Sequence, residues 1–335
     1  MTGPQALYLP SRAKLNLVLR ILGRRDDGYH LLESLFHTLD LHDDVVVEYD
    51  MKGSGIGITV SADHERLLVP DDERNLAVKA LVALRQEHGS SATGGFHIRL
   101  HKRIPNGGGL GGGSSNAAAV LRLANALLAK DSPASSSSRA ALGDSQIAAI
   151  GAQLGADVPF FLRGGTQWGR GIGTDLTEAG NLSGYFVLLL PAYGCGTVEV
   201  YKKHASAWSP TQQVDSIAAI SVPGILHSAL GNRLFNDLES AAEQVRPQLG
   251  RLRQAVEKAG YSDVRMSGSG STLFVMTADL ATAEQCQRHL AVELAQTEHC
   301  DVEFVVASSG TAIDFDQPSS RLPKSLWHRP RDPMS

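Results

Sequence analysis

Hydrophobic and polar residues alternate along several short stretches of the chain and recur at helical spacing along others. Near-alternation predicts strands at Ala6–Leu22, Asp44–Asp50 and Ile56–Ser61. Residues Asn75–Gln86 place apolar side chains three and four positions apart, which predicts an amphipathic helix. The pattern alternates again at Phe96–Leu100. The first hundred residues therefore predict four strands and one helix.

The same two periodicities predict further helices and strands along the rest of the chain. Gly260 follows one of these helices, as glycine often does where a helix ends. The expected elements are the helices Ser114–Lys130, Gln146–Leu154, Asn232–Ser240 and Glu243–Ala259 and the strands Tyr185–Leu190 and Val302–Ala307.

Two segments carry no hydrophobic pattern. Residues 131–144 are rich in serine and alanine, which predicts an exposed and mobile insertion between two helices. From Asp316 the chain is polar and contains four prolines, and we expect a disordered tail there.

The second half of the chain is expected to begin near Thr166, after a corner that contains two glycines.

A glycine-rich run stands directly before the helix predicted to begin at Ser114. It contains Gly107–Gly109 and Gly111–Gly113, where the backbone can approach a ligand without a Cβ in the way. The unpaired N–H groups and positive dipole end of a following helix favour an anion. The alternative is a flexible linker, but linkers of that kind continue into glycine, serine or charge, whereas this run enters an alanine- and leucine-rich helix. We therefore predict a phosphate-binding loop, with Ser114, Ser115 or Asn116 capping the helix.

The type of loop is informative as well. The common P-loop pattern ending in Gly-Lys-Ser/Thr is absent from the sequence. Gly107, Gly109 and Gly112 match the dinucleotide fingerprint, but the preceding strand is rich in histidine and charged residues, unlike the buried strand of a doubly wound sheet. No well-placed acidic residue follows about 20 positions later, since Asp131 comes at the end of the helix.

Composition limits the classes of protein that the chain can belong to. Lys and Arg number 31 against 35 Asp and Glu, a net charge of −4, which argues against a general nucleic-acid-binding surface. No apolar run approaches the 18 residues that suggest a membrane span. Cys195, Cys286 and Cys300 form no CxxC pair, so we expect reduced thiols rather than a zinc site or a disulfide framework. These features predict a cytoplasmic protein that binds neither nucleic acid nor membrane.

Three motifs in order resemble those of the GHMP kinases, the superfamily of galactokinase, homoserine kinase, mevalonate kinase and phosphomevalonate kinase. They are Ser11–Asn16, residues 105–117 and Met266–Gly270, and the resemblance spans roughly residues 1–315. With the glycine loop, Gly28–His30 and Gly155–Phe160 further resemble the family of 4-diphosphocytidyl-2-C-methyl-D-erythritol kinases. Arg12 stands where that family usually has proline, beside an intact Lys14 and Asn16.

The resemblance implies an α+β, two-domain fold. An ATP-binding domain at 1–165 would resemble a ribosomal-protein domain and contain the serine-rich insertion 131–144. A domain at 166–315 would resemble a ferredoxin-like layer of helices on an antiparallel sheet, followed by the tail 316–335. The active site would lie in the cleft between the domains. The sequence leaves open whether the protein is a monomer or a homodimer.

The resemblance also implies a reaction in isoprenoid precursor synthesis by the methylerythritol phosphate route. The γ-phosphoryl group of ATP would pass to a tertiary alcohol, the 2-hydroxyl of the substrate. Asp157 is the candidate base, because a carboxylate can accept the hydroxyl proton; the alternative is a carboxylate that caps or braces the turn before Pro159. Lys14 is its candidate partner, rather than a surface lysine on a strand, since an ammonium keeps a nearby carboxylate ionised.

Four residues resemble those of a pocket for the cytosine of the substrate. Tyr29 and His30 offer an aromatic face and a ring nitrogen, although such a pair alone is more often a surface loop. The resemblance places Thr197 and Tyr201 across the same pocket, with Tyr201 as a second stacking ring. Asn16 can both donate and accept a hydrogen bond and could orient the substrate.

ATP is the expected co-substrate, with Mg²⁺ inferred from the phosphate chemistry and no protein metal ligand singled out. Ser267, Gly268, Ser269 and Gly270 are expected to form a tight turn near the loop or the substrate diphosphate, and the alternative is a plain hairpin turn. The candidate ATP-binding residues are Asn75, Lys102, Pro105, Asn106, Gly107, Gly108, Gly109, Leu110, Gly111, Gly112, Gly113, Ser114 and Ser115.

Two rival functions remain open at this point. A non-catalytic sensor with the same fold would keep the glycine loop and lose the base or the lysine, whereas Lys14 and Asp157 are both present. Another GHMP kinase would act on mevalonate or homoserine. Gly28–His30 argues against that kinase, because those substrates carry no nucleobase.

Overall fold

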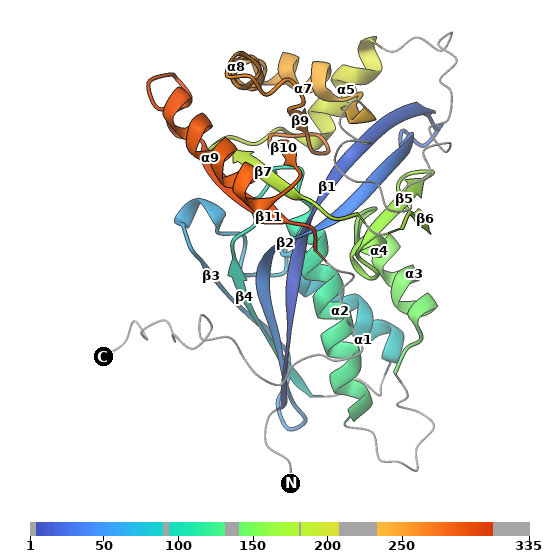
Figure 1. The fold of residues 1–335 in the computed structure, drawn as a ribbon. Helices are drawn as coiled ribbons and strands as arrows, with labels where there is room; N and C mark the ends of the chain where they lie inside the picture. Colours follow the sequence, from blue (N-terminus) through green and yellow to red (C-terminus); the bar gives the residue numbers. More distant parts are fainter. Residues whose placement is uncertain (1–4, 90–93, 131–140, 181, 208–232, 311–335) are drawn as a thin grey trace.

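The computed structural model describes residues 5–89, 94–130, 141–180, 182–207 and 233–310. These residues form two β-sheets with helices on their outer sides (Figure 1). Most of the serine-rich segment and the whole of the predicted tail lie outside the described residues. The α+β architecture expected from the sequence is confirmed.

A long antiparallel hairpin forms the centre of the larger sheet (Figure 1). Its strands are β1 (Gln5–Arg24) and β2 (His30–Asp50). Strands β3 (Ile56–Ala62) and β4 (Gly95–Lys102) extend the sheet beyond β2, with β3 parallel to β4. The other members are β8 (Phe235–Asn236), which runs parallel to β1, and β5 (Thr166–Arg170), which pairs with β2 and with β6 (Asp175–Glu178).

Strand β2 begins fourteen residues before the predicted strand at Asp44. Its first half contains Glu33, Ser34, His37 and Thr38, which are all buried. A search for alternating apolar residues passes over such a stretch, because it assumes that buried positions are apolar. Hydrogen bonds satisfy three of these four side chains, as where His37 contacts Thr166 and Ser309 at 2.9 and 3.0 Å. The hydroxyl of Thr38 is buried without a side-chain partner among the described residues.

Four helices cover one face of the larger sheet. They are α1 (Leu76–His88), α2 (Gly112–Lys130), α3 (Asp144–Leu154) and the short α4 (Val158–Phe161). Apolar side chains of the helices and of the sheet pack into one core, in which α2 is almost wholly buried along its length. Because α2 is packed so tightly, the glycine loop at its N-terminal end has a rigid support.

The smaller sheet has the strand order and connections of a ferredoxin-like unit. Its strands are β7 (Tyr185–Leu190), β9 (Arg265–Met266), β10 (Leu273–Thr277) and β11 (Glu303–Ser308), and every neighbouring pair is antiparallel. The helices that follow its strands are α5 (Thr197–Ala207), α7 (Glu239–Val245), α8 (Pro247–Lys258) and α9 (Leu280–Leu294).

Alternation along β7 shows how the two sheets are joined. Phe186 and Leu188 contribute to a core shared with β1 and β2, whereas Val187 and Leu189 belong to the core beneath the helices of the smaller sheet. Successive side chains of a strand point to opposite faces, so β7 is buried on both. The layers are therefore helices, larger sheet, smaller sheet and helices (Figure 1).

Two predicted elements in the second half were wrong. The helix expected at Glu243–Ala259 is two helices, because Pro247 disfavours helical geometry at Arg246, whose φ and ψ are −132° and 85°. The helix expected at Asn232–Ser240 includes β8, and α7 begins only at Glu239. Strands β5, β6 and β8 also join the larger sheet although they follow residue 165. The domain boundary at 165 stays a prediction.

Candidate active site

A cleft of about 990 Å³ lies beside the N-terminal end of α2. Its walls come from β1, the residues before β2, the beginning of α1, the glycine loop, α5 and the turn between β9 and β10. Segments that are far apart in the sequence therefore meet around one space. The predicted site residues that line it are Lys14, Asn16, Tyr29, His30, Asn75, Lys102, Pro105, Asn106, Gly107, Gly108, Gly109, Gly111, Gly112, Gly113, Ser114, Asp157, Thr197, Tyr201, Gly268 and Ser269.

The glycine loop has a backbone that other residues would adopt only under strain. Gly107, Gly109 and Gly111 have φ angles of 69°, 78° and 73°, in the left-handed region. Helix α2 begins at Gly112, two residues earlier than predicted, so Gly112 and Gly113 form its first turn. The unpaired N–H groups of that turn are thus presented without side chains, as an anion site requires.

Two of these glycines are also fixed by close neighbours. A Cβ on Gly109 would lie 2.1 Å from the carbonyl oxygen of Ser267, and one on Gly111 would lie 2.7 Å from the ring of Phe161. Neither neighbour is the free end of a flexible side chain. The loop therefore needs glycine for packing as well as for its dihedral angles.

The predicted cap of α2 was wrong. Ser114, Ser115 and Asn116 lie inside the helix, because it begins in the glycine run. Ser114 lines the cleft, but Ser115 is buried and its hydroxyl accepts a hydrogen bond from Ser11 at 2.8 Å. Leu110 is fully buried, and its carbonyl oxygen accepts from the backbone N–H of Lys14 at 3.0 Å. Of these residues, Ser114 is the one whose position suits contact with phosphate.

Lys14 is a buried lysine at the centre of the site. Its Nζ donates to the carbonyl oxygen of Gly109 at 2.9 Å and to the amide oxygen of Asn16, and it lies 3.8 Å from Oδ2 of Asp157. Burial lowers the pKa of the ammonium, and the carboxylate of Asp157 opposes that change. The alternative of a surface lysine is thereby excluded.

Asp157 faces the cleft with a side chain that is 33% exposed. It stands at the N-terminal end of α4, yet its carboxylate makes no capping hydrogen bond to that helix. The capping role considered from the sequence is therefore absent. A carboxylate that is open to the cleft and beside an ammonium has the position that a general base needs.

Lys102 is enclosed below the loop. The residue is 2% exposed, and its Nζ donates to Asp43 and, at 3.2 Å, to Asn116. Asp43 also accepts from the backbone N–H groups of Arg103 and Ile104 at 2.7 and 2.8 Å. Lys102 thus ties the end of β4 to α2, and its contact with ATP stays a prediction.

Asn75 directly precedes α1 at the wall of the cleft. Its amide oxygen accepts from the N–H of Ala77 at 3.0 Å, and its amide nitrogen donates to the carbonyl of Pro70 at 2.6 Å. This is a helix cap that also fixes the preceding loop. The contact of Asn75 with ATP stays a prediction.

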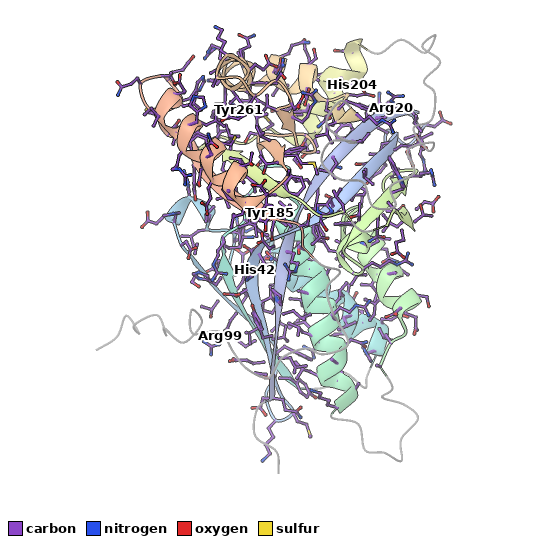
Figure 2. The ribbon with its side chains drawn as sticks, in the orientation of Figure 1. Arg20, His42, Arg99, Tyr185, His204 and Tyr261 are labelled. Carbon is purple, nitrogen blue, oxygen red and sulfur yellow. The ribbon has the colours of Figure 1, made fainter. Side chains whose placement is uncertain are left out.

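Aromatic rings gather at another part of the cleft. Tyr29 is 60% exposed, and the ring of His30 lies 5.0 Å from that of Tyr201, measured between centroids, at an angle of 45°. Burial and the nearby His204 and Arg24 lower the pKa of His30, and its Nε2 is buried without a hydrogen-bond partner in the described part of the chain. Figure 2 shows His204 on α5, near the ends of β1 and β2.

The turn between β9 and β10 is both a hairpin turn and a support for the glycine loop. The hydroxyl of Ser267 donates to the carbonyl of Gly109 at 3.0 Å, and the N–H of Thr272 donates to the carbonyl of Gly108 at 3.1 Å. Ser269 and Thr197 join their hydroxyls at 3.0 Å, which links the turn to α5. The two interpretations made from the sequence are therefore compatible.

Sequence reasoning missed several polar residues that hold this site together. Ser34 accepts from the side-chain amide of Asn16 at 2.7 Å, and Asp43 holds Lys102. Asn236 contacts the turn between β9 and β10. None of these residues lies in a glycine-rich or recognisable motif, so their role follows from tertiary contacts alone.

Family comparisons agree with this geometry. Residues 75–165 match the family described as GHMP kinases N terminal domain, and residues 221–294 match the one described as GHMP kinases C terminal. A 4-diphosphocytidyl-2-C-methyl-D-erythritol kinase of Alkaliphilus metalliredigens is 34% identical over 87% of this chain and 94% of its own length. The chain belongs to the GHMP kinase superfamily.

Other relatives of this GHMP kinase carry the same name. A 4-diphosphocytidyl-2-C-methyl-D-erythritol kinase of Xanthomonas campestris is 38% identical over 84% of this chain and 85% of its own length. A crystal structure of 4-(cytidine 5'-diphospho)-2C-methyl-D-erythritol kinase is 30% identical, with a TM-score of 0.66 over 91% of this chain and all of that one. A homoserine kinase structure at 20% identity and a TM-score of 0.63 shows the shared fold alone.

The GHMP kinase assignment implies that the enzyme uses ATP and a small-molecule acceptor. Among the described residues, no helix has the length and apolar character to span a membrane. The same residues contain no cluster of three or more His, Cys, Asp or Glu side chains placed to hold a metal ion.

Proposed function

We propose that this kinase transfers the γ-phosphoryl group of ATP to the 2-hydroxyl of 4-diphosphocytidyl-2-C-methyl-D-erythritol. One observation carries the proposal: the Lys14–Asp157 pair, the glycine loop and the ring pair of His30 and Tyr201 share a single cleft. The curated relatives with this activity support the choice of acceptor.

The reacting end of the cleft contains the groups that such a transfer needs. As the substrate oxygen forms its bond to the γ-phosphorus, Asp157 accepts the hydroxyl proton and the bond from phosphorus to the ADP oxygen breaks. Lys14, 3.8 Å from this carboxylate, stabilises negative charge on the transferring group. The first turn of α2 and the glycine loop bind the phosphates through backbone N–H groups.

Mg²⁺ fits this arrangement through oxygen donors. The hydroxyl of Ser114 and the carboxylate of Asp157 both line the cleft, and Mg²⁺ prefers oxygen ligands that it shares with nucleotide phosphates. When bound, the ion neutralises charge on the phosphates. Ser114 is the residue that would hold it, together with phosphate oxygens of the nucleotide, while Asp157 stays free to act as the base.

The aromatic part of the cleft suits a nucleobase. Tyr29 and Tyr201 offer faces for stacking, and His30 offers a buried ring nitrogen without a protein partner to read a polar edge. Burial raises the pKa of the Tyr201 hydroxyl, so the ring stays neutral beside Asp157. Mevalonate and homoserine would leave these groups unused.

A coupled ADP-release assay with alternative acceptors tests the proposal. We expect turnover with 4-diphosphocytidyl-2-C-methyl-D-erythritol and none above background with mevalonate or homoserine. A thermal-shift control should show stabilisation by cytidine nucleotides and none by the other two acceptors. Turnover of mevalonate or homoserine in preference to the cytidyl compound would replace this proposal with another GHMP activity.

A further inference from the structure

A buried asparagine outside the predicted motifs holds the turn between β9 and β10. Asn236 is 6% exposed, and its amide nitrogen donates to the carbonyl oxygens of Met266 and Gly268 at 2.8 and 2.7 Å. Its amide oxygen accepts from the backbone N–H of Leu238 at 2.9 Å. Both N–H groups of the amide are used, and the three contacts fix which end is nitrogen.

The strand that carries this side chain is attached to β1. Asn236 pairs with Leu19 in parallel register, and the N–H of Asp237 donates to the carbonyl of Leu19 at 3.0 Å. The carboxylate of Asp237 accepts in turn from the N–H of Ile21 at 2.8 Å. Asn236 is therefore anchored to the strand on which Lys14 stands.

The turn held by Asn236 contacts the reacting groups directly. Ser267 donates to the same Gly109 carbonyl that accepts from Lys14 Nζ. Gly268 approaches so closely that a Cβ there would lie 3.2 Å from the amide oxygen of Asn16 and 3.4 Å from Lys14 Nζ. A displacement of this turn would be transmitted to Gly109 and Lys14 without an intervening flexible group.

We propose that Asn236 is a positioning residue for phosphoryl transfer. It fixes the turn Ser267–Gly270 relative to β1, so that Ser267 holds Gly109 and Gly109 holds Lys14 opposite Asp157. The choice of acceptor in the assay rests on the proposed function, whereas the effect on ATP binding depends only on the glycine loop. These two readouts separate a failure of this inference from a failure of the proposed function.

Asn236→Asp is the informative variant, because it keeps the shape of the side chain and removes both donors. Its carboxylate would face two carbonyl oxygens, which must then move or stay unpaired. We expect kcat to fall roughly 10-fold or more, since small misplacements of reacting groups are costly. The Kd for ATP should weaken about 10-fold, and KM for the cytidyl substrate should change less than about twofold.

Asn125→Asp provides a matched control. Asn125 is also buried, donates to the carbonyl of Leu142 at 3.0 Å and accepts from its N–H at 2.9 Å, but it does not line the cleft. Both variants should lose thermal stability. A merely structural role for Asn236 predicts equal effects in the two variants on kcat and on the Kd for ATP.

Steady-state kinetics and calorimetric titration with ATP, both well below the melting temperatures, decide the matter. If Asn236→Asp does not fold, Asn236→Ala, which removes the donors without adding charge, carries the same test. The inference is overturned if the Asn236 variant keeps the kcat and the ATP affinity of the Asn125 control. If the wild type binds ATP but phosphorylates no cytidyl acceptor, the proposed function is contradicted. The positioning role of Asn236 is then tested by comparing the Kd for ATP of the Asn236 and Asn125 variants.

Discussion

One ammonium group connects the residues at the reacting end of the cleft. Lys14 contacts Asn16 and Gly109 and faces Asp157, with its side chain almost wholly removed from water. In such surroundings a charge interacts more strongly than at the surface, and the loss of a partner costs more. Lys14 and Asp157 should therefore act as a unit rather than as two independent contributions.

Changing Asp157→Asn should lower kcat by roughly 10²-fold or more, as expected for the loss of a general base. ATP and substrate should still bind nearly as well, because the amide has almost the shape of the carboxylate. Steady-state kinetics with both substrates measure this split. Near-normal turnover would show that Asp157 has no role in proton transfer.

The double variant with Lys14→Ala examines whether the pair acts together. Lys14→Ala alone should also lower kcat, and the combined loss should fall well short of the product of the two single losses, as for residues that act as a unit. The double-mutant cycle is measured on kcat. Fully multiplicative losses would mean that the two residues work separately.

His37 should make stability depend on pH below neutrality. Burial lowers its pKa to about 3, whereas the unfolded chain has the ordinary histidine pKa of about 6.5. Between these values the unfolded state binds the extra proton, so the free energy of unfolding falls as pH falls, by up to about 1.4 kcal/mol per pH unit. Above pH ~6.5 this contribution is fully present.

Urea unfolding of the wild type and of His37→Phe between pH 7 and 5 measures that dependence. The variant should be less stable at pH 7, because Thr166 and Ser309 lose their buried partner. The wild type should therefore have the larger free energy of unfolding at pH 7. Because only the wild type loses stability through protonation of His37, this difference should shrink as the pH falls. Parallel curves for the two proteins would exclude His37 as the titrating group.

Among the elements, the glycine loop depends on a partner from the other sheet. The turn between β9 and β10 fills the space that a side chain on Gly109 would need. Gly109 and Ser267 are 158 residues apart in the sequence, and a hydrogen bond joins them. The loop and the turn therefore support each other. The proposed nucleotide site is thus completed by both sheets.

Gly109→Ala should reduce ATP binding and turnover far more than an equally strained glycine elsewhere. Its φ of 78° disfavours alanine, and the new Cβ would lie 2.1 Å from the Ser267 carbonyl oxygen. We expect kcat/KM for ATP to fall roughly 10²-fold, because the loop must move away from the turn.

Gly89→Ala is the matched control for this change. Gly89 has a φ of 62°, with nothing within 4 Å of the added Cβ, at the end of α1. Its φ of 62° and ψ of −146° lie in a region that favours glycine, so the change should cost about 1–3 kcal/mol of stability and leave the kinetics unchanged. Equal kinetic losses in both variants would show that strain, and not the contact with Ser267, matters at Gly109.

Elements were predicted well from the sequence where their buried residues are apolar and their exposed residues are polar. Strand β7 and helix α1 lie within one or two residues of their predicted bounds. The first half of β2 was missed because several of its buried side chains are polar. Strand β8 was missed because a strand of two residues is too short to show the alternation of apolar and polar positions. Glycine and lysine motifs located the site, but Asn236 and Asp43 act through contacts that no local pattern records.

At the scale of the whole molecule, the two sheets pack face to face and leave the cleft at one end of their contact. Phe186 and Phe274 from the smaller sheet and Leu15 and Leu17 from β1 are buried in the shared core. This core holds β1, and with it Lys14, against the sheet that supplies the turn. The glycine loop and the Lys14–Asp157 pair, to which we assign the nucleotide and the phosphoryl transfer, are therefore held by one packed interface.

The proposed function depends most on recognition of the acceptor by its cytosine. The most direct measurement compares kcat/KM for the cytidyl substrate and for its uridyl counterpart, in the wild type and in His30→Ala. Uracil replaces the exocyclic amine by a carbonyl, which reverses donor and acceptor at that edge.

We expect the wild type to prefer cytosine by roughly 10-fold or more, as when a buried polar contact is lost. His30→Ala should raise KM for the cytidyl substrate by a similar factor while KM for ATP stays nearly constant. Equal kcat/KM for the two nucleobases, or a defect confined to ATP in His30→Ala, would contradict the account.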